Sequence, residues 1–254
     1  MAEIYRYKMI VEYDGGHFHG WQRQYNSLQG DLKTVQGALQ SALFKITGQT
    51  VVVEGAGRTD AGVHATGQVA HFDLTTFYPA PRLGDALNFY VRTQGVVVLH
   101  IEQVALQFHA RFSAISRTYQ YHIINRRSPL ALDNHRAWHV INKLDGEAMR
   151  DAAQHLIGHY DFSAFRAAEC QGNSPFKTLT KFDIQWAGER IMATIQARSF
   201  LHHQVRIMMG TLKLIGEGKW TQEDLVKIRD EKQRKLAGPT APAHGLYLVD
   251  VGYN

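Results

Sequence analysis

The chain has a single cysteine, Cys170, and six prolines among its 254 residues. One thiol cannot close an intramolecular disulfide, which excludes a disulfide-stapled fold, and no base accompanies Cys170 in a pattern typical of a nucleophile. No apolar run approaches the roughly 18 residues that a membrane-spanning helix needs. The N-terminal residues begin directly with strand-like alternation, so we expect a cytoplasmic protein without a membrane partner.

Hydrophobic residues make up 44% of the chain and charged residues 20%, a balance typical of globular proteins that excludes a mainly disordered chain. The length is sufficient for one large core or for two ordinary domains. Lys and Arg total 28 against 23 Asp and Glu, which gives a net charge of +5. This charge favours a polyanionic partner, although many basic proteins of this size bind no nucleic acid.

Hydrophobic periodicity predicts the order β-α-β-β-α-β twice along the chain. In the first half we expect strands at 4–13, 51–53, 68–74 and 96–101, with helices between Thr34 and Gly48 and from Pro81 to Tyr90. In the second half we expect strands at 119–124, 178–186, 191–197 and 246–251, with helices from Asp145 to Gly158 and over 205–215. This order predicts an α+β protein of two tandem ferredoxin-like (βαββαβ) domains, 1–108 and 109–254, with helices on one face of each antiparallel sheet.

The most unusual stretch is residues 55–68, which we interpret as an irregular loop between two strands. Four glycines in it allow positive φ angles or a close approach to another molecule, and they flank Arg58 and Asp60. The stretch could be a solvated connection or a loop built around a ligand. It is not a phosphate-binding loop, because no Gly-Lys-Ser/Thr follows and it leads into a strand rather than a helix.

The segment Gly57-Arg58-Thr59-Asp60-Ala61-Gly62-Val63-His64-Ala65, followed by Gly67-Gln68-Val69, closely resembles the catalytic motif of the tRNA pseudouridine synthase A family. Other segments resemble that family in the same order: Gly20-Trp21-Gln22, Thr34-Val35-Gln36-Gly37, Arg117-Thr118-Tyr119-Gln120-Tyr121, Asp161 to Phe165, Ser199-Phe200-Leu201 with Val205-Arg206, and Gly245 to Leu248. The resemblance therefore covers nearly the whole chain.

The resemblance implies an isomerase, an intramolecular transferase that converts uridine to pseudouridine in tRNA, on the 3′ side of the anticodon stem-loop. It also implies that the two sheets meet at a central RNA-binding cleft, that the protein is a homodimer, and that it uses no cofactor. The resemblance marks Asp60 as the catalytic group, acting either as a nucleophile or as a base. For either role the carboxylate must stay ionised while partly desolvated, which a nearby guanidinium favours.

The same resemblance implies a substrate-binding set. Arg206 would pair with Asp60, Arg58 would contact RNA where the target nucleotide leaves the stack, Tyr119 would stack on the uracil, and Leu246 would pack near the base. The residues themselves leave alternatives open. Tyr119 and its neighbour of the same strand parity, Tyr121, could be core aromatics, and Arg206 could be a surface arginine.

Three long insertions interrupt the second half: Asn125 to Asn142, His159 to Phe176 and Glu217 to His244. Long loops in compact domains are usually functional or disordered. The first two carry the cations Arg126, Arg127, Arg136, Arg166 and Lys177 among aromatics. They could form an RNA-gripping surface, or they could be solvated loops of ordinary basic content.

A His202-His203 pair departs from the family pattern before Arg206, so we carry over no role for these neighbours. We expect no metal site there, since no third ligand stands at a usable spacing. The rival to an RNA-modifying enzyme is a cofactor-free RNA-binding module, but no aromatic run of the kind such modules expose occurs. A small-molecule hydrolase using Asp60 lacks a second carboxylate at a recognisable place.

Overall fold

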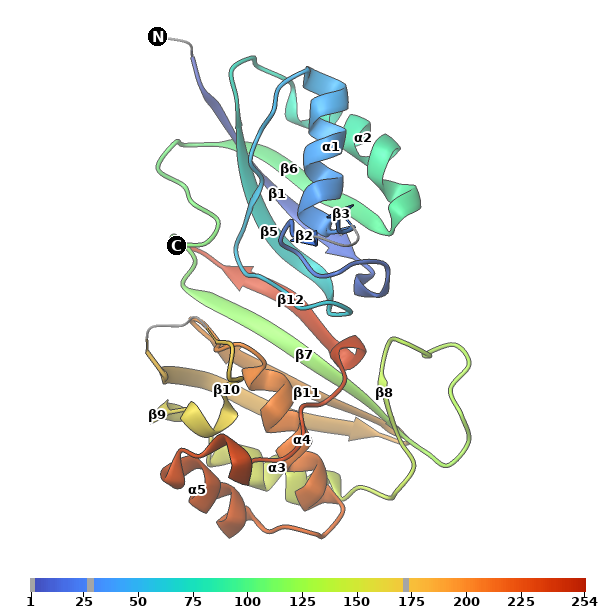
Figure 1. Cartoon of the computed structure of the whole chain (residues 1–254), viewed down its shortest axis with the longest axis vertical. Coiled ribbons are helices and arrows are strands. Elements are labelled where there is room, and N and C mark those ends of the chain that lie inside the picture. The colour runs from blue at the N-terminus through green and yellow to red at the C-terminus, as the bar shows by residue number, and fades with distance from the viewer. Residues whose placement is uncertain (1–2, 27–29, 171–173) are drawn as a thin grey trace. The chain divides into compact units, whose positions relative to one another are not determined.

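The computed structural model describes residues 3–26, 30–170 and 174–254 (Figure 1). The protein is α+β, with mainly antiparallel strands and five α-helices among the described residues. The chain forms two compact units: unit 1 is Met1–Ile115 with Leu248–Asn254, and unit 2 is Ser116–Tyr247. Among the described helices, none combines the length and the apolar character needed to cross a bilayer.

These bounds differ from the predicted 1–108 and 109–254, because residues beyond 108 bond within unit 1. The Tyr253 hydroxyl donates to the Ala110 carbonyl at 2.7 Å, and the Ile115 N–H donates to the Gly252 carbonyl at 2.9 Å. The backbone of the C-terminal segment also lies close to Gly67, where a Cβ would be 2.2 Å from the Val249 oxygen.

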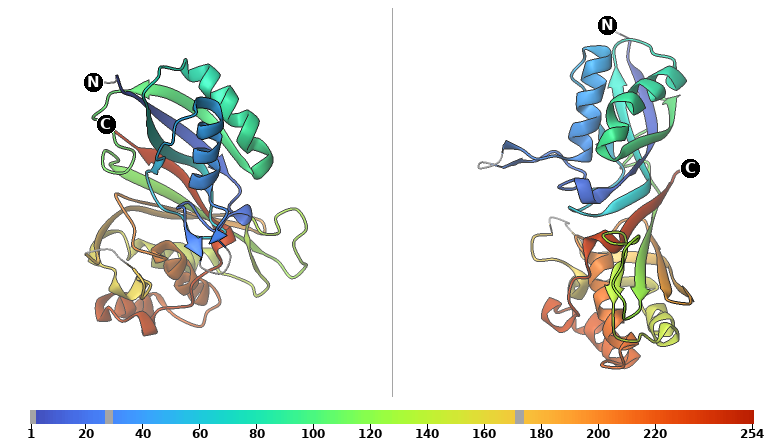
Figure 2. Two further views of the ribbon diagram at one scale, coloured as in Figure 1. Left: turned by 45° about the horizontal axis from the view of Figure 1, so that its top comes forward. Right: turned by 90° about the vertical axis from the view of Figure 1, so that its right-hand side faces the viewer.

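Unit 1 follows the predicted strand and helix order with small additions. Its elements are β1 (Tyr5–Tyr13), η1 (Gly15–His17), β2 (Tyr25–Asn26), β3 (Gly30–Asp31), α1 (Val35–Thr47), β4 (Glu54–Gly55), β5 (His64–Leu74), α2 (Ala80–Val91), η2 (Arg92–Gln94), β6 (Val96–Val104) and the greater part of β12 (Leu246–Gly252). The main strands lie in the order β6-β1-β5, and both β4 and β12 lie along the other side of β5. Figures 1 and 2 show α1 and α2 side by side over one face of this sheet.

The ends of α1 are set by local side chains and backbone, as predicted. Thr34 Oγ1 accepts a hydrogen bond from the Gly37 N–H at 3.2 Å, and Gly48 ends the helix with φ +70°. Glycine adopts such a left-handed conformation without the steric cost that other residues have. The helix α2 begins at Ala80, one residue before Pro81.

The predicted strand over 51–53 is wrong, and the predicted loop over 55–68 is shorter than expected. Residues 51–53 form no ladder, although Val51 and Val53 are buried. The pairing strand is the short β4, in which Glu54 lies opposite His71. Since β5 begins at His64, the irregular part of the motif is residues 56–63.

Within unit 2 the antiparallel strands lie in the order β7-β11-β10-β9, with β8 parallel to β7. Its elements are β7 (Ser116–Asn125), β8 (Trp138–Val140), α3 (Gly146–Gln154), β9 (Gly158–Asp161), η3 (Ser163–Phe165), β10 (Phe176–Ala187), β11 (Arg190–Ala197), α4 (Gln204–Gly216), α5 (Gln222–Glu231), η4 (Arg234–Leu236), η5 (Ala243–Gly245) and the start of β12. The predicted hairpin turn at Gly188, with φ +60°, is confirmed.

The three insertions predicted as loops contain regular structure, which corrects that prediction. They hold β8, β9 and the helix α5. A capping box starts α5: Thr221 Oγ1 accepts from the Asp224 N–H at 3.3 Å, and Asp224 Oδ2 accepts from the Thr221 N–H at 2.8 Å. The helix α3 ends at Gln154 rather than at Gly158, and Gly158, with φ +126°, is the first residue of β9.

Candidate active site

Asp60 occupies the first position of a tight turn in unit 1. The Val63 N–H donates to the Asp60 carbonyl at 3.1 Å, and Gly62 has φ +79°. A positive φ at the third position defines a type II turn, which favours glycine there. The Asp60 side chain is half-buried, whereas Arg58, two residues earlier, is exposed. The motif thus presents a partly desolvated carboxylate with a cation on the same short loop.

The residue before Asp60 is clamped by the N-terminal segment. The hydroxyls of Tyr13 and Thr59 lie 2.8 Å apart in a buried hydrogen bond, and the Trp21 N–H donates to the Thr59 carbonyl at 3.0 Å. Gly20 has φ +94°, and a Cβ there would lie 2.6 Å from the Thr59 oxygen. This close backbone approach requires glycine and fixes the peptide that carries Asp60.

The two ends of the loop are also held by buried groups. Gln68 is fully buried, and its Nε2 donates to the Gly57 carbonyl at 2.7 Å. At the other end, the Gly15 N–H donates to Nδ1 of the buried His64 at 3.1 Å. A Cβ at Gly15 would lie 2.0 Å from the Val63 oxygen. The loop is therefore positioned before any ligand arrives, which lowers the cost of orienting the carboxylate.

In unit 2, Tyr119 lies on β7 and is 9% exposed. Its ring meets the ring of Phe200 edge to face, with centroids 5.2 Å apart. Tyr121, two residues on, is fully buried, and its hydroxyl donates to the Pro242 carbonyl at 2.8 Å. Burial raises the pKa of Tyr121 well above its ordinary value. Both tyrosines are therefore buried, Tyr121 completely and Tyr119 nearly so.

Arg206 lies on α4 and is half-buried, so it is not a solvated surface arginine. Its Nε donates to the Ala241 carbonyl at 2.8 Å, and the Ala241 N–H donates to the Arg206 carbonyl at 3.0 Å. Its positive charge is also close enough to Tyr121 to oppose the upward pKa shift of that phenol. Leu246 is 6% exposed and follows Gly245, where a Cβ would lie 2.7 Å from the Tyr121 ring.

The structure thus brings the predicted residues together in two groups. Arg58 and Asp60 share one loop of unit 1, while Tyr119, Arg206 and Leu246 belong to unit 2. The pairing of Asp60 with Arg206 joins residues of different units and stays a prediction. The buried residues that hold the Asp60 loop were not predicted from the sequence, although one of them, Gln68, lies within the motif.

A family model described as tRNA pseudouridine synthase matches residues 9–113 and 152–254. The chain belongs to this family. The tRNA pseudouridine synthase A of Paramagnetospirillum magneticum is 55% identical over 249 residues, which cover 98% of this chain and 95% of that protein. Those of Sinorhizobium fredii and Rhodospirillum centenum are 50% and 51% identical, over 98% of this chain and 99% of each relative.

The match to the tRNA pseudouridine synthase model includes most of the predicted site. Arg58, Asp60, Arg206 and Leu246 lie inside the matched segments, whereas Tyr119 lies between them. The full-length relatives nevertheless align with 98% of this chain.

Not all the cations predicted to grip RNA are available to do so. The Arg126 Nη1 forms an ion pair with Glu189 Oε1 at 2.8 Å, and its other nitrogens donate to the carbonyls of Ser128 and Pro129. These bonds hold the turn at 126–129, so Arg126 has a structural role. Its neighbour Arg127 is exposed and is the better candidate for a phosphate contact.

Two further cations of the predicted set, Arg166 and Lys177, donate hydrogen bonds to backbone carbonyls of the second insertion. Arg166 Nη2 donates to the Cys170 carbonyl at 2.6 Å, and Lys177 Nζ donates to the Ser174 carbonyl at 3.0 Å. Burial lowers the pKa of Lys177, and the charge of Arg166 acts in the same direction. Arg136 is exposed, which leaves it with Arg127 as the solvent-facing members of the set.

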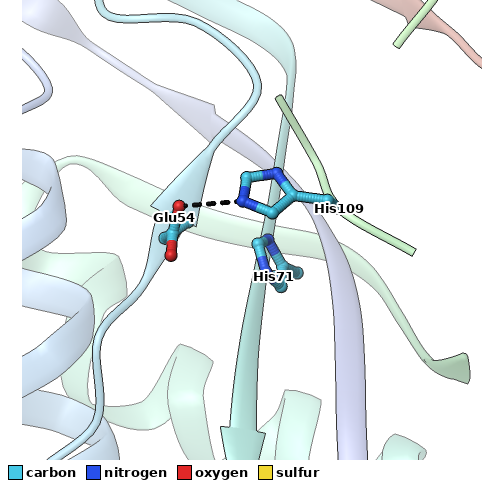
Figure 3. A group of neighbouring side chains, drawn as sticks. All are labelled: Glu54, His71 and His109. Atoms are coloured by element: carbon cyan, nitrogen blue, oxygen red, sulfur yellow. Dashed lines mark ion pairs between the residues drawn. The ribbon is translucent and has the colours of Figure 1, made fainter. Parts of the chain in front are cut away.

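A second group of polar side chains in unit 1 consists of Glu54, His71 and His109, whose ligand-type atoms lie within 4.8 Å of one another (Figure 3). His109 Nε2 lies 3.1 Å from Glu54 Oε2. Backbone N–H groups donate to Nδ1 of both rings: that of Ala110 to His71 at 3.3 Å and that of Arg111 to His109 at 3.1 Å. Because its Nδ1 accepts a backbone hydrogen bond, each ring would carry its proton on Nε2 in the neutral form.

The buried ring of His71 makes the stability of the fold depend on pH. Burial lowers the pKa of His71, the charges of His109 and Arg6 act in the same direction, and Glu54 and Asp73 oppose them. The unfolded chain has the ordinary histidine pKa of about 6.5 and binds the proton first as the pH falls. The contribution of His71 to the free energy of unfolding is therefore complete above about pH 6.5 and is lost progressively as the pH falls below that value.

We expect His71→Asn to reduce this acid-side loss of stability. The Asn Oδ1 can take the place of Nδ1 as acceptor for the Ala110 N–H but does not titrate in this range. The measurement is the free energy of urea unfolding of both proteins from pH 5 to pH 8. An equal decline in variant and parent would show that His71 does not contribute.

Proposed function

We propose that the protein isomerises uridine to pseudouridine in tRNA, on the 3′ side of the anticodon stem-loop, with Asp60 as the catalytic group. The observation that carries this proposal is the Gly57–Ala65 motif, whose aspartate is half-buried on a turn fixed by the buried Tyr13–Thr59 hydrogen bond. The family match and the full-length relatives support it. Such a preformed, partly desolvated carboxylate suits nucleophilic or general-base chemistry better than a solvated loop aspartate would.

The reaction breaks the N1–C1′ bond of a uridine, turns the detached uracil and joins C1′ to C5. The hydrogen at C5 then leaves as a proton and N1 gains one, so atoms and electrons balance without an oxidant, a reductant or an energy source. We therefore propose that no cofactor is used. Asp60 either attacks the ribose and departs when C5 bonds to C1′, or removes a ribose proton so that the glycosidic bond can break and returns it to the same carbon when C1′ joins C5.

The other predicted residues take supporting roles in this proposal. Tyr119 stacks on the uracil, Leu246 packs against the base, and Arg206 holds the Asp60 carboxylate ionised and oriented. Arg58, exposed beside Asp60 on the same loop, contacts the RNA where the target nucleotide leaves the stack. The half-buried position of Arg206, fixed by its bond to Ala241, supports a positioning role over a general phosphate contact.

We further propose that each unit is built on a ferredoxin-like fold and that the two sheets meet at a central RNA-binding cleft. In support, β1, α1, β4, β5, α2 and β6 follow the βαββαβ order in unit 1, and β7, α3, β10, β11, α4 and the start of β12 follow it in unit 2. The neighbours β6-β1-β5 in unit 1 and β7-β11-β10 in unit 2 fit this topology. We also propose a cytoplasmic homodimer with the Asp loop in the N-terminal domain and the RNA-binding insertions in the C-terminal one.

The site of modification can be mapped directly. Unmodified tRNA transcripts are incubated with the protein, treated with a carbodiimide that forms a stable adduct with pseudouridine, and read by reverse transcription. We expect protein-dependent stops at uridines on the 3′ side of the anticodon stem-loop. Stops confined to another arm would overturn the proposed position, and their complete absence would favour an RNA-binding module.

A further inference from the structure

The turn at residues 109–113 of unit 1 is a closed, hydrogen-bonded loop. The His109 N–H donates to Ser113 Oγ at 3.0 Å, and the Ser113 N–H donates to the His109 carbonyl at 2.9 Å. Nδ1 of His109 accepts from the N–H groups of Arg111 at 3.1 Å and Phe112 at 3.3 Å. The backbone at the tip of the turn is thus fixed by its own first and last residues.

The same turn is fastened to three other parts of unit 1. His109 is paired with Glu54 of β4 (Figure 3), and Ala110 donates its N–H to His71 of β5. The Ala110 carbonyl accepts from the hydroxyl of Tyr253 at the C-terminal end. Because the turn is held on several sides, its tip residues are presented in a defined position rather than on a loose loop.

At this tip, Phe112 is 71% exposed. Its ring lies 4.4 Å from the His109 ring, centroid to centroid, and the Arg111 guanidinium carbon lies 5.5 Å from the Phe112 centroid. Most of the Phe112 side chain is thus in contact with solvent, on a backbone that hydrogen bonds hold in place. The aromatic face and the adjacent guanidinium match the two chemical features of a nucleic acid strand, a flat base and a negative phosphate.

We propose that Arg111 and Phe112 form a contact site for the substrate RNA, in which the Phe112 ring stacks on an unpaired base and the Arg111 guanidinium faces the neighbouring phosphate. The inference rests on the proposed function for its ligand, tRNA, but not on the identity of the catalytic group. A protein partner is the rival occupant. The cation held over the ring, in a chain of net charge +5, favours a polyanion instead.

The contact also fits the energetics of strand binding. A segment that becomes ordered only on binding has a lower affinity, because the ordering costs free energy. The turn at 109–113 is already ordered by its own hydrogen bonds. Stacking on a single aromatic side chain changes affinity about 5- to 100-fold, and it tolerates any base. We therefore expect Phe112 to contribute to affinity for tRNA without selecting a sequence.

The test compares variants of the whole chain by their affinity for tRNA that the parent protein has already modified to completion, so that binding is not mixed with turnover. We expect Phe112→Leu, which keeps an apolar side chain but loses the aromatic face, to weaken binding about 5- to 100-fold. Phe112→Tyr should bind within about twofold of the parent. The matched control is Phe89→Leu on α2, because Phe89 is 68% exposed and belongs to the same unit.

Arg111→Gln provides the second arm of the test. If the guanidinium faces a phosphate, the slope of log Kd against log salt concentration should fall by about one in this variant. It should remain at the parent value in Phe112→Leu, since stacking releases no counterions. Sedimentation of every variant reports the oligomeric state in parallel.

These measurements distinguish a failure of the proposed RNA contact from a failure of the proposed function. Equal tRNA affinity of Phe112→Leu, Phe89→Leu and parent would overturn the proposed contact while leaving the proposed function intact. Dissociation of the Phe112→Leu protein into smaller species would overturn it in favour of a contact between copies of the chain. Failure of the parent protein itself to bind tRNA would instead contradict the proposed function.

Discussion

Asp60→Asn is expected to reduce pseudouridine formation at least about 10³-fold while leaving tRNA affinity within a few fold. The amide keeps the shape of the side chain but can act neither as nucleophile nor as base. The loop itself should persist, because Thr59, Gly57 and His64 hold it. Turnover is measured by chromatography of nucleosides from digested tRNA, and affinity by filter binding.

The matched control for this variant is Asp85→Asn. Asp85 is an exposed aspartate on α2 of the same unit, so the same chemical change there should leave both turnover and affinity at the parent values. Turnover of Asp60→Asn near the parent rate would remove Asp60 from the catalytic role. A parallel loss of affinity would instead assign the carboxylate to RNA binding.

Arg206→Ala should lower the rate of the chemical step about 10²- to 10³-fold and change tRNA affinity far less. We expect this because the side chain is half-buried and its Nε is bonded to the Ala241 carbonyl, which aims the rest of the guanidinium in one direction. Arg206→Lys should recover only part of the rate, since an ammonium cannot keep that bond and also form a bidentate pair with a carboxylate. Single-turnover kinetics with excess protein separate the chemical step from binding.

Arg127→Ala is the comparison for this prediction. Arg127 is exposed next to the structural Arg126, so its loss should weaken binding and flatten the salt dependence without slowing the chemical step. If Arg206→Ala showed that same pattern, Arg206 would be a phosphate contact and the proposed pairing with Asp60 would be wrong.

Features determined by neighbouring residues could be predicted from the sequence. The helix α1 starts at the Thr34 cap and ends at Gly48, as expected, and the hairpin turns at Gly188. The helix α5 was missed although Thr221 and Asp224 carry a capping signal, because that insertion lacks a continuous apolar stripe and was interpreted as a loop. The strand expected at 51–53 failed because β propensity alone does not provide a pairing partner.

Features that depend on distant residues could not be predicted in this way. The last strand belongs largely with unit 1, whose other residues end at Ile115, and bonds such as that between Tyr253 and Ala110 hold it there. The motif identified Asp60, but the Tyr13 hydroxyl that fixes its loop stands 46 residues from Thr59, a separation that leaves no local pattern. For Arg126 the sequence was misleading. The basic composition of its insertion suggested RNA binding, whereas its ion pair with Glu189 gives it a structural role.

The release of hydrogen from uracil C5 tests directly whether this chain isomerises uridine in tRNA through Asp60. Joining C1′ to C5 must expel that hydrogen, so tRNA carrying tritium at C5 of its uridines should release label into water when the protein is added alone, without ATP or a reductant. We expect release by the parent protein, none by Asp60→Asn, an unbroken RNA chain and no free uracil. Tight tRNA binding by the parent without release of label would contradict this expectation.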